Sequence, residues 1–215
     1  MDKHILIFGT SITYGAWDSQ GGWASRLRNF INKSLISKGI KTEILVYNQG
    51  ISGAKSTDIL KTFEPETEAR LGHNRDNEII IIFDLGINDS IFNASIGTTE
   101  VDLDKFTENM KTLIRNAKKY SKNIVVLGLT PADQRVDPMP WPPNGRSFRN
   151  DNIIEFNQAL DNISREEKVD FIEIFRQFTS NDYSSLLSDG VHLNDKGHEK
   201  VYEMVRDYLL ENKII

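Results

Sequence analysis

Residues 4–15 of the chain read HILIFGTSITYG. The apolar run at 4–8 predicts a strand buried on both faces, and the Gly9 that follows it predicts a tight turn. Ser11 then stands at the carboxyl end of that strand, and this is the edge at which open α/β sheets bind ligands. Ser11 is therefore a candidate nucleophile, provided that the chain brings a base, an acid and an oxyanion site to the same edge.

The composition is that of an ordinary globular domain. The 215 residues are enough for one domain with a sizeable core, and we expect residues 1–215 to form it. Hydrophobic residues make up 39% and charged residues 27%, which argues against disorder. A net charge of −5 and the lack of a basic tract disfavour a nucleic-acid partner.

The chain contains no cysteine. This excludes disulfides, thiolate nucleophiles and cysteine-based zinc sites, and it fits a reducing compartment. The sequence shows no signal-peptide pattern and no apolar run near the roughly 18 residues of a membrane helix. We therefore expect a cytoplasmic protein without a membrane span.

Apolar runs and amphipathic stretches alternate along the chain. Continuous apolar or β-branched character predicts strands at residues 4–8, 42–47, 78–85, 123–129 and 169–174. Helical spacing of apolar residues predicts helices at residues 23–36, 56–63, 103–120, 152–167 and 195–210. The alternation predicts an α/β fold in which helices cover a mainly parallel sheet through right-handed connections.

Residues 131–150 interrupt this alternation. They read PADQRVDPMPWPPNGRSFRN and contain five of the six prolines of the chain. A loop of this length without regular structure is usually functional or disordered. It follows a predicted strand, so we interpret it as a wall of a substrate pocket at the edge that carries Ser11; the alternative is a mobile surface loop. Its arginines (Arg135, Arg146 and Arg149) either meet an anionic group or are solvated. We expect this pocket to be lined by Thr10, Trp17, Trp141 and Arg149.

Asp189 and His192 lie three residues apart, just before the last predicted helix. A turn there brings the carboxylate to one imidazole nitrogen, where it fixes the tautomer, while the other nitrogen faces the nucleophile. His192 is thus the candidate base and Asp189 its orienting acid. His198, which lies inside the helix, is the alternative base.

The same residue types also allow a metal site. An Asp–His pair with a further His suits a transition metal, but a mononuclear site needs another convergent ligand, and Asp89 is the one obvious choice. Metal-dependent hydrolysis therefore stays an alternative, while we expect neither a metal nor a cofactor.

Two more stretches follow predicted strands, at residues 48–53 and 86–89. The side-chain amide of Asn88 can donate hydrogen bonds to a developing oxyanion without ionising. A glycine lets a backbone N–H approach a ligand closely, and Gly53 is the better candidate, with Gly50 as the alternative. Together with the backbone N–H of Ser11, Gly53 and Asn88 form the predicted oxyanion hole.

The four stretches, in this order, resemble the blocks of the SGNH hydrolases, the GDSL-type esterases and lipases. The serine, glycine, asparagine and histidine of those blocks match Ser11, Gly53, Asn88 and His192, and the family's acid matches Asp189. The resemblance spans residues 9 to 192. It implies a flavodoxin-like, three-layer α/β/α sandwich around a mainly five-stranded parallel sheet, and hydrolysis of esters or thioesters without a cofactor. Carbohydrate acetyl esters are further substrates to consider, and a small-molecule ester is the expected partner.

The chain departs from the family pattern at one residue. The first block usually reads Gly-Asp-Ser, whereas Thr10 stands here in place of the aspartate. Thr10 leaves the predicted triad intact but carries no charge, so altered activity, or a non-catalytic binding protein on the same fold, is an alternative to the esterase. Ser52 is a rival nucleophile, because residues 50–54 (GISGA) are one residue short of the G-x-S-x-G elbow of α/β-hydrolases.

Overall fold

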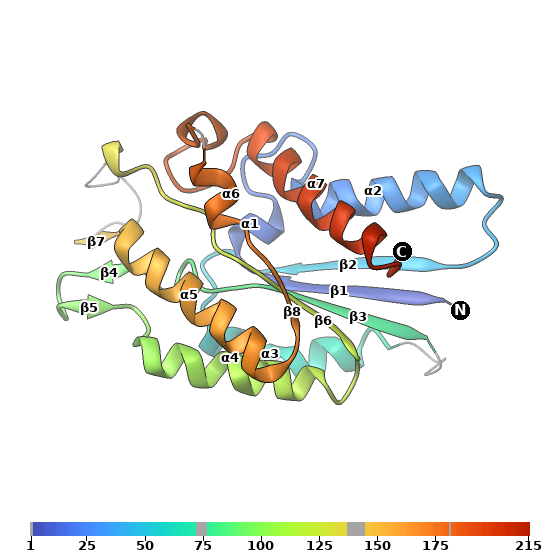
Figure 1. Ribbon diagram of the computed structural model, residues 1–215, viewed down its shortest axis with the longest axis horizontal. Coiled ribbons are helices and arrows are strands. Elements are labelled where there is room, and N and C mark those ends of the chain that lie inside the picture. Colours follow the sequence, from blue (N-terminus) through green and yellow to red (C-terminus); the bar gives the residue numbers. More distant parts are fainter. Residues whose placement is uncertain (1, 72–76, 137–144, 181) are drawn as a thin grey trace.

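A computed structural model describes residues 2–71, 77–136, 145–180 and 182–215. Its centre is a five-stranded, all-parallel sheet with the order β2-β1-β3-β6-β8 (Figure 1). The strands are β1 Lys3–Gly9, β2 Ile44–Gly50, β3 Glu78–Asp84, β6 Asn123–Leu127 and β8 Asp170–Ile172. All five lie where strands are predicted, and the flavodoxin-like α/β fold is confirmed.

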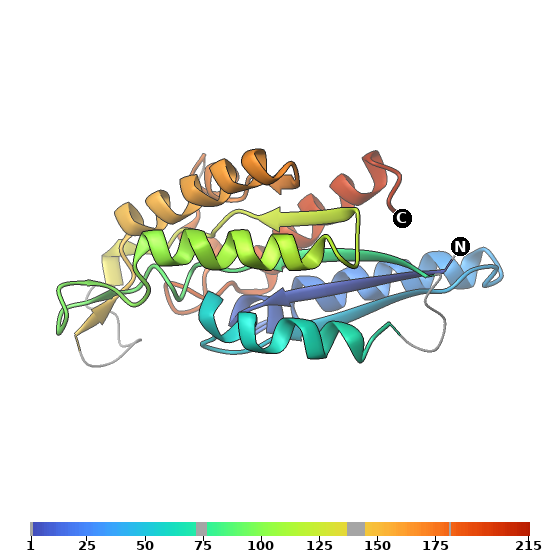
Figure 2. The ribbon, with the colours of Figure 1, turned by 90° about the horizontal axis from the view of Figure 1, so that it is seen from below.

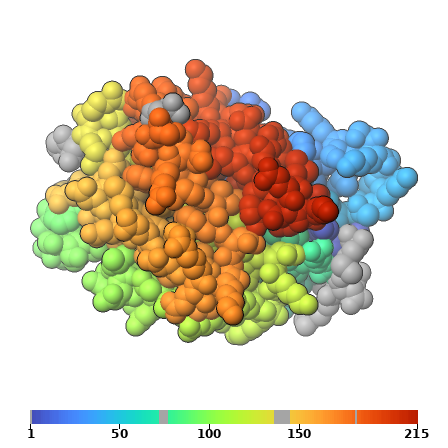
Figure 3. Space-filling model, viewed as in Figure 1, coloured from blue at the N-terminus to red at the C-terminus, as the bar shows by residue number. Residues whose placement is uncertain are grey.

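Five long helices cover the sheet: α2 Gly22–Ser37, α3 Ser56–Glu68, α4 Leu103–Ala117, α5 Asn150–Glu167 and α7 Asp195–Glu211. α2 packs against α7 on one face, while α4 packs between α3 and α5 on the other (Figures 1 and 2). In the space-filling view the chain from α5 to α7, orange to red, conceals much of the sheet (Figure 3). Shorter helices are α1 Ser11–Tyr14, α6 Phe175–Thr179 and the 3-10 turns Gln134–Val136 and Ser184–Leu186.

The core lies on both faces of β1 and β3. Their central side chains are fully buried, as continuous apolar strands predict (Ile5, Leu6, Ile7, Ile80, Ile81 and Ile82). α4 turns its predicted apolar stripe inward (Phe106, Met110, Leu113, Ile114 and Ala117). Burial of each of the larger side chains contributes about 1.5–3 kcal/mol to folding, so the sheet is a rigid base for the loops at its carboxyl edge.

The structure corrects the expected end of one helix. The sequence predicts that the helix starting at residue 56 ends at Phe63, but α3 continues to Glu68 through Pro65. Phe63 and Thr67 are both fully buried, so packing of this last turn on the core outweighs the hydrogen bond that proline cannot make.

A second, small sheet was not predicted. Strands β5 Thr98–Thr99, β4 Phe92–Asn93 and β7 Arg146–Ser147 pair antiparallel beyond the carboxyl ends of the main strands (Figure 1). Strands of two residues carry no readable alternation, so the sequence cannot reveal them. Their position makes them a wall of any site at this edge.

In the described ranges, no helix is long and apolar enough to cross a membrane.

Candidate active site

The carboxyl end of β1 leads directly into the nucleophile candidate. Thr10 caps α1, with its Oγ1 accepting from the N–H of Ile12 across 3.4 Å, and Ser11 is the first helical residue. Thr13 in the same helix donates to the carboxylate of Asp84 at the end of β3, across 2.6 Å. α1 is therefore attached to the sheet on both sides of Ser11, which fixes the position of its side chain.

Ser11, His192 and Asp189 form a continuous hydrogen-bonded chain. Oγ of Ser11 lies 2.9 Å from Nε2 of His192, and Nδ1 of His192 lies 2.7 Å from Oδ2 of Asp189. The side chains of His192 and Asp189 are 13% and 27% exposed, so the imidazole is largely shielded from water. Residues 181 positions apart thus meet in the order that nucleophile, base and orienting acid require.

The carboxylate of Asp189 receives four N–H donors. Oδ1 accepts from the backbone N–H groups of Val191 and His192, and Oδ2 faces His192 Nδ1 and the indole N–H of Trp17. Partial burial raises the pKa of Asp189, but the hydrogen bonds from His192 and Val191 outweigh it and hold that pKa well below its usual range. Asp189 is therefore ionised at any pH at which the fold is expected to work.

The predicted oxyanion donors border the same cavity as Ser11. Gly53 has φ +76°, a left-handed conformation that glycine adopts without strain, and this conformation accounts for glycine at position 53. Asn88 is 8% exposed, and its Nδ2 donates to the carbonyl of Ala54 across 2.9 Å. An amide carries two N–H donors, so this bond orients Asn88 and leaves the second donor for a ligand.

Gly50, the alternative oxyanion donor, serves packing instead. Its N–H donates to Oδ1 of Asn48 across 2.9 Å. A Cβ at this position would lie 2.3 Å from the backbone nitrogen of Tyr14, so glycine lets α1 sit directly on β2. The expectation that Gly50 is a reserve donor is therefore wrong.

Asp89, the proposed further metal ligand, is fully buried. Its carboxylate accepts from the backbone N–H of Ser56 at 3.0 Å and from the Ser56 hydroxyl at 2.5 Å. It thereby joins the loop of Asn88 to the start of α3, just after Gly53. Burial raises the pKa of Asp89 to about 6, against the lowering effect of the Ser56 hydrogen bonds. Among the described residues, no three acidic or histidine side chains gather as a metal would require.

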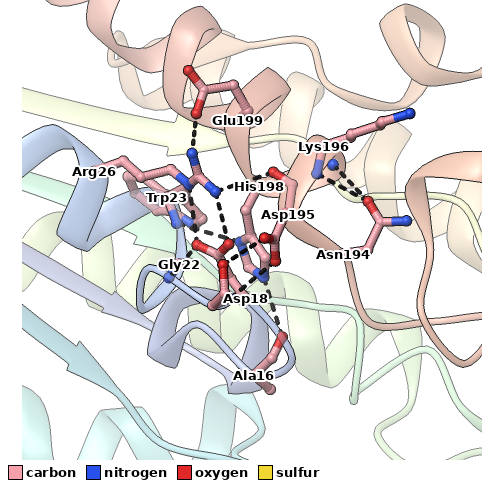
Figure 4. Close-up of polar contacts among 12 residues, drawn as sticks. Ala16, Asp18, Gly22, Trp23, Arg26, Asn194, Asp195, Lys196, His198 and Glu199 are labelled. Carbon is pink, nitrogen blue, oxygen red and sulfur yellow. Dashed lines mark hydrogen bonds and ion pairs between the residues drawn. The ribbon is translucent and has the colours of Figure 1, made fainter.

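The rival base and the rival nucleophile lie apart from this chain of hydrogen bonds. His198 is fully buried; its Nδ1 accepts from the backbone N–H of Trp23 at 3.3 Å, and its Nε2 lies 3.2 Å from the carbonyl oxygen of Ala16 (Figure 4). Burial lowers the pKa of His198, so it stays neutral, and it connects α7 to the start of α2 and to the loop at Ala16. Ser52 is exposed at the cavity mouth, and within the described chain no base contacts it.

The cavity at Ser11 has a volume of about 210 Å³ and two kinds of wall. One wall is apolar (Ile12, Ile87, Ile91, Phe148 and Val191), and the other is charged (Lys55, Glu100 and Arg146). β7 and the chain around β4 and β5 supply most of the charged wall. The sequence did not single out Lys55, Glu100 or Phe148. Glu100 and Phe148 directly follow β5 and β7, and these strands are too short to be recognised in the sequence.

The residues expected to line the pocket lie elsewhere. Thr10 is fully buried beneath α1 and does not reach the cavity. Arg149 does not line the cavity either, and its guanidinium lies 3.5 Å from the ring centre of Phe92. Trp17 borders His192 and Asp189 from outside, with its ring edge-on to the imidazole at 6.0 Å. These three expectations are wrong for the described lining, and Trp141 lies outside the described residues.

Comparison with known proteins assigns the family. Residues 7–200 match the model of the GDSL-like lipase/acylhydrolase family, which is far more than half of the chain. The chain belongs to this family. It is accordingly a hydrolase that acts on ester bonds, and the resemblance seen in the sequence blocks is confirmed.

Relatives of this GDSL-like hydrolase match nearly its whole length. It is 27% identical over 219 residues to the isoamyl acetate-hydrolyzing esterase of Saccharomyces cerevisiae, a match that covers 97% of this chain and 85% of the yeast protein. It is 25% identical over 217 residues to the isoamyl acetate-hydrolyzing esterase 1 homolog of Bos taurus, covering 98% of this chain and 82% of the bovine protein.

Solved structures share the fold of the GDSL-like hydrolase. The lipase/acylhydrolase from Enterococcus faecalis superposes with a TM-score of 0.72 at 20% identity, covering 97% of this chain and 95% of that protein. The acetyl xylan esterase AlAXEase gives a TM-score of 0.71 at 21% identity, covering 96% of this chain and 99% of the esterase. The three-layer α/β/α architecture is therefore the one that the sequence blocks imply.

Proposed function

We propose that this hydrolase is a serine esterase that cleaves small carboxylic esters through an acyl-enzyme. The observation that carries the proposal is the hydrogen-bonded chain Ser11–His192–Asp189 in the lining of the cavity. Because Asp189 is an ionised acceptor of Nδ1–H, His192 keeps Nε2 free to accept the proton of the Ser11 hydroxyl. Oγ of Ser11 then attacks the ester carbonyl carbon.

The first half of the reaction ends with the departure of the alcohol. The oxyanion of the tetrahedral intermediate accepts hydrogen bonds from the backbone N–H groups of Ser11 and Gly53 and from the amide of Asn88. Each such preorganised donor is worth about 10²–10³ in turnover. The imidazolium of His192, stabilised by Asp189, returns its proton to the leaving oxygen, and the acyl group stays on Ser11.

The second half repeats these steps with water. His192 accepts a proton from water as the water oxygen attacks the acyl carbon, and it then returns that proton to Oγ of Ser11, releasing the acid. These steps involve side chains and backbone groups of this chain alone. We further propose that residues 1–215 act as one hydrolase domain and that the enzyme works in the cytoplasm, as the cysteine-free composition suggests.

Short acyl esters are the substrates that fit best. A cavity of about 210 Å³ is small, and its apolar wall suits a short acyl or alkyl group. The relatives from yeast and cattle are named for hydrolysis of isoamyl acetate, an ester of this kind. Thioesters and acetylated carbohydrates share the acyl chemistry, and a substrate panel that varies the leaving group ranks them against simple esters.

Steady-state hydrolysis of 4-nitrophenyl acetate tests the proposal. We expect Ser11→Ala and His192→Ala to lose up to about 10⁶ in kcat, with a far smaller loss in Ser52→Ala, which removes a hydroxyl from the same cavity. Circular dichroism shows whether each variant is folded. Turnover by Ser11→Ala close to that of the wild type would overturn the assignment.

A further inference from the structure

The charged wall of the cavity is organised around one carboxylate. Glu100 follows β5, Arg146 lies in β7 and Lys55 immediately precedes α3, so three separate segments meet there. Oε1 of Glu100 accepts from Nε of Arg146 and from Nδ2 of Asn93, and Oε2 accepts from Nζ of Lys55 across 2.7 Å. We call Lys55, Glu100 and Arg146 the ionic wall.

In the ionic wall the carboxylate is buried and the two cations are partly exposed. The side chain of Glu100 is 9% exposed, whereas those of Lys55 and Arg146 are 32% and 39% exposed. Burial raises the pKa of Glu100, but hydrogen bonds from Lys55 and Arg146 outweigh it and lower the pKa overall. Glu100 is therefore ionised at neutral pH, and it holds two cations at the surface of the cavity.

Lys55 and Arg146 have more N–H donors than their hydrogen bonds to Glu100 use. Lysine has three N–H donors and arginine five, and each gives only one hydrogen bond to the carboxylate within the described chain. Arg146 uses Nε, so its two Nη groups keep the parallel geometry that binds a carboxylate in bidentate fashion. The ionic wall has two positive charges and one negative charge, which leaves a surplus of one positive charge.

The other carboxylate of the cavity, Asp189, makes no ion pair with Lys55 or Arg146 in the part of the chain that the structure describes. Its oxygens accept instead from Trp17, Val191 and His192. Apolar side chains such as Ile91 and Phe148 line the same cavity, and they limit the access of water and strengthen charge interactions. A single surplus positive charge in such a cavity matches one anionic group on a ligand.

We propose that the ionic wall is a carboxylate-binding subsite, so that the preferred ester carries a second, ionised carboxyl group. Lys55 and Arg146 bind this group while Ser11 attacks the ester, and Glu100 orders the two cations before substrate arrives. The inference rests on the proposed esterase function, since it places the carboxylate on the substrate of that same cavity.

Two pairs of matched esters test the subsite and show which side of the ester carries the charge. Mono-4-nitrophenyl adipate and its neutral methyl ester place the carboxylate on the acyl side. 4-Acetoxybenzoate and methyl 4-acetoxybenzoate place it on the alcohol side. We expect kcat/KM for the anionic member to exceed that for the neutral member in one pair, and added salt to reduce the ratio.

The variants test which residues produce this preference. We expect Arg146→Gln and Lys55→Gln each to reduce the anionic-to-neutral ratio of kcat/KM about tenfold, through a higher KM for the anionic ester. We expect Arg146→Lys to restore part of this ratio. Arg165→Gln is the matched control, because Arg165 is paired on the surface of α5. Ratios near one in both pairs, or ratios that neither variant changes, would overturn the subsite. Failure of the folded wild type to hydrolyse any of the four esters would instead overturn the proposed function.

Discussion

The indole N–H of Trp17 donates a hydrogen bond of 3.0 Å to Oδ2 of Asp189, the oxygen that also faces Nδ1 of His192. Trp17 is 61% exposed and has φ 67°, a left-handed conformation that costs energy for a residue with a Cβ. A large exposed aromatic residue in a strained conformation must be held by its contacts. The hydrogen bond from Trp17 reaches Asp189, the proposed orienting acid, so we expect Trp17 to position the Asp189–His192 pair.

We expect Trp17→Phe to lower kcat for 4-nitrophenyl acetate, by up to about tenfold, with little change in KM. Loss of the indole donor leaves Oδ2 of Asp189 with one hydrogen bond fewer, so the Asp189–His192 pair is held less firmly. Tyr14→Phe, at another exposed aromatic residue close by, is the control. A kcat for Trp17→Phe equal to that of the wild type, or a loss no larger than in Tyr14→Phe, would contradict this role.

The loop that carries Trp17 is connected to α7 through a buried ion pair, Asp18–Arg26, and through polar side chains at the start of α7 (Figure 4). Nη2 and Nε of Arg26 donate to the carboxylate of Asp18 at 2.7 and 3.0 Å, while Nη1 contacts Glu199 of α7. Oδ1 of Asp195, at the start of α7, accepts from the backbone N–H of Ser19 at 2.9 Å. Burial raises the pKa of Asp18, but the hydrogen bond from Arg26 and those from other groups lower it to about 2.

Arg26→Gln is expected to destabilise the protein strongly. The side chain of Asp18 is fully buried and that of Arg26 is 8% exposed, so the substitution leaves a buried carboxylate without its cation. We expect the free energy of unfolding to fall by about 3 kcal/mol, measured by urea denaturation. Arg165→Gln breaks an exposed ion pair and should cost less than about 1 kcal/mol. Equal losses of the free energy of unfolding in the two variants would show that the buried ion pair stabilises the protein no more than the exposed one.

Asp89 gives the stability of the protein a defined pH dependence. Its pKa is about 6 in the folded chain, against an ordinary value of 3.8. Between these values the folded protein retains a proton that the unfolded chain has released, so the contribution of Asp89 to stability falls as pH rises through this window. Above pH 6 the buried, ionised Asp89 lowers the free energy of unfolding by its full amount, roughly 3 kcal/mol.

Asp89→Asn removes that titration while keeping the shape of the side chain. We expect the free energy of unfolding of the variant, minus that of the wild type, to increase from pH 4 to pH 7 by roughly 3 kcal/mol. Urea denaturation at four pH values measures it, with Asp207→Asn, at an exposed carboxylate, as the control. A difference that is constant with pH would show that the carboxylate titrates normally.

Short-range patterns in the sequence were sufficient for the main sheet and the central residues of the site. The apolar run before Ser11 is readable because a strand covered on both faces is continuously hydrophobic, and parallel strands end at one edge. The three-residue spacing of Asp189 and His192 is local, so a single turn is enough to bring them together. These features depend on neighbours in sequence.

The rest of the site depends on tertiary packing. Glu100 and Arg146 become neighbours only through strands of two residues, which have no periodicity to read. Thr10 is adjacent to Ser11 but its side chain faces the core, and the sequence gives no indication of that direction. Arg149 lies in the proline-rich loop as expected, yet it stacks on Phe92 because that ring is presented by β4.

Covalent labelling of the nucleophile tests the central claim most directly. The wild-type enzyme is incubated with a fluorophosphonate, and its intact mass and the modified peptide are determined by mass spectrometry. We predict one adduct per chain, located on Ser11, with loss of 4-nitrophenyl acetate hydrolysis in proportion to labelling. An adduct on Ser52, or full labelling of the Ser11→Ala variant, would contradict the account.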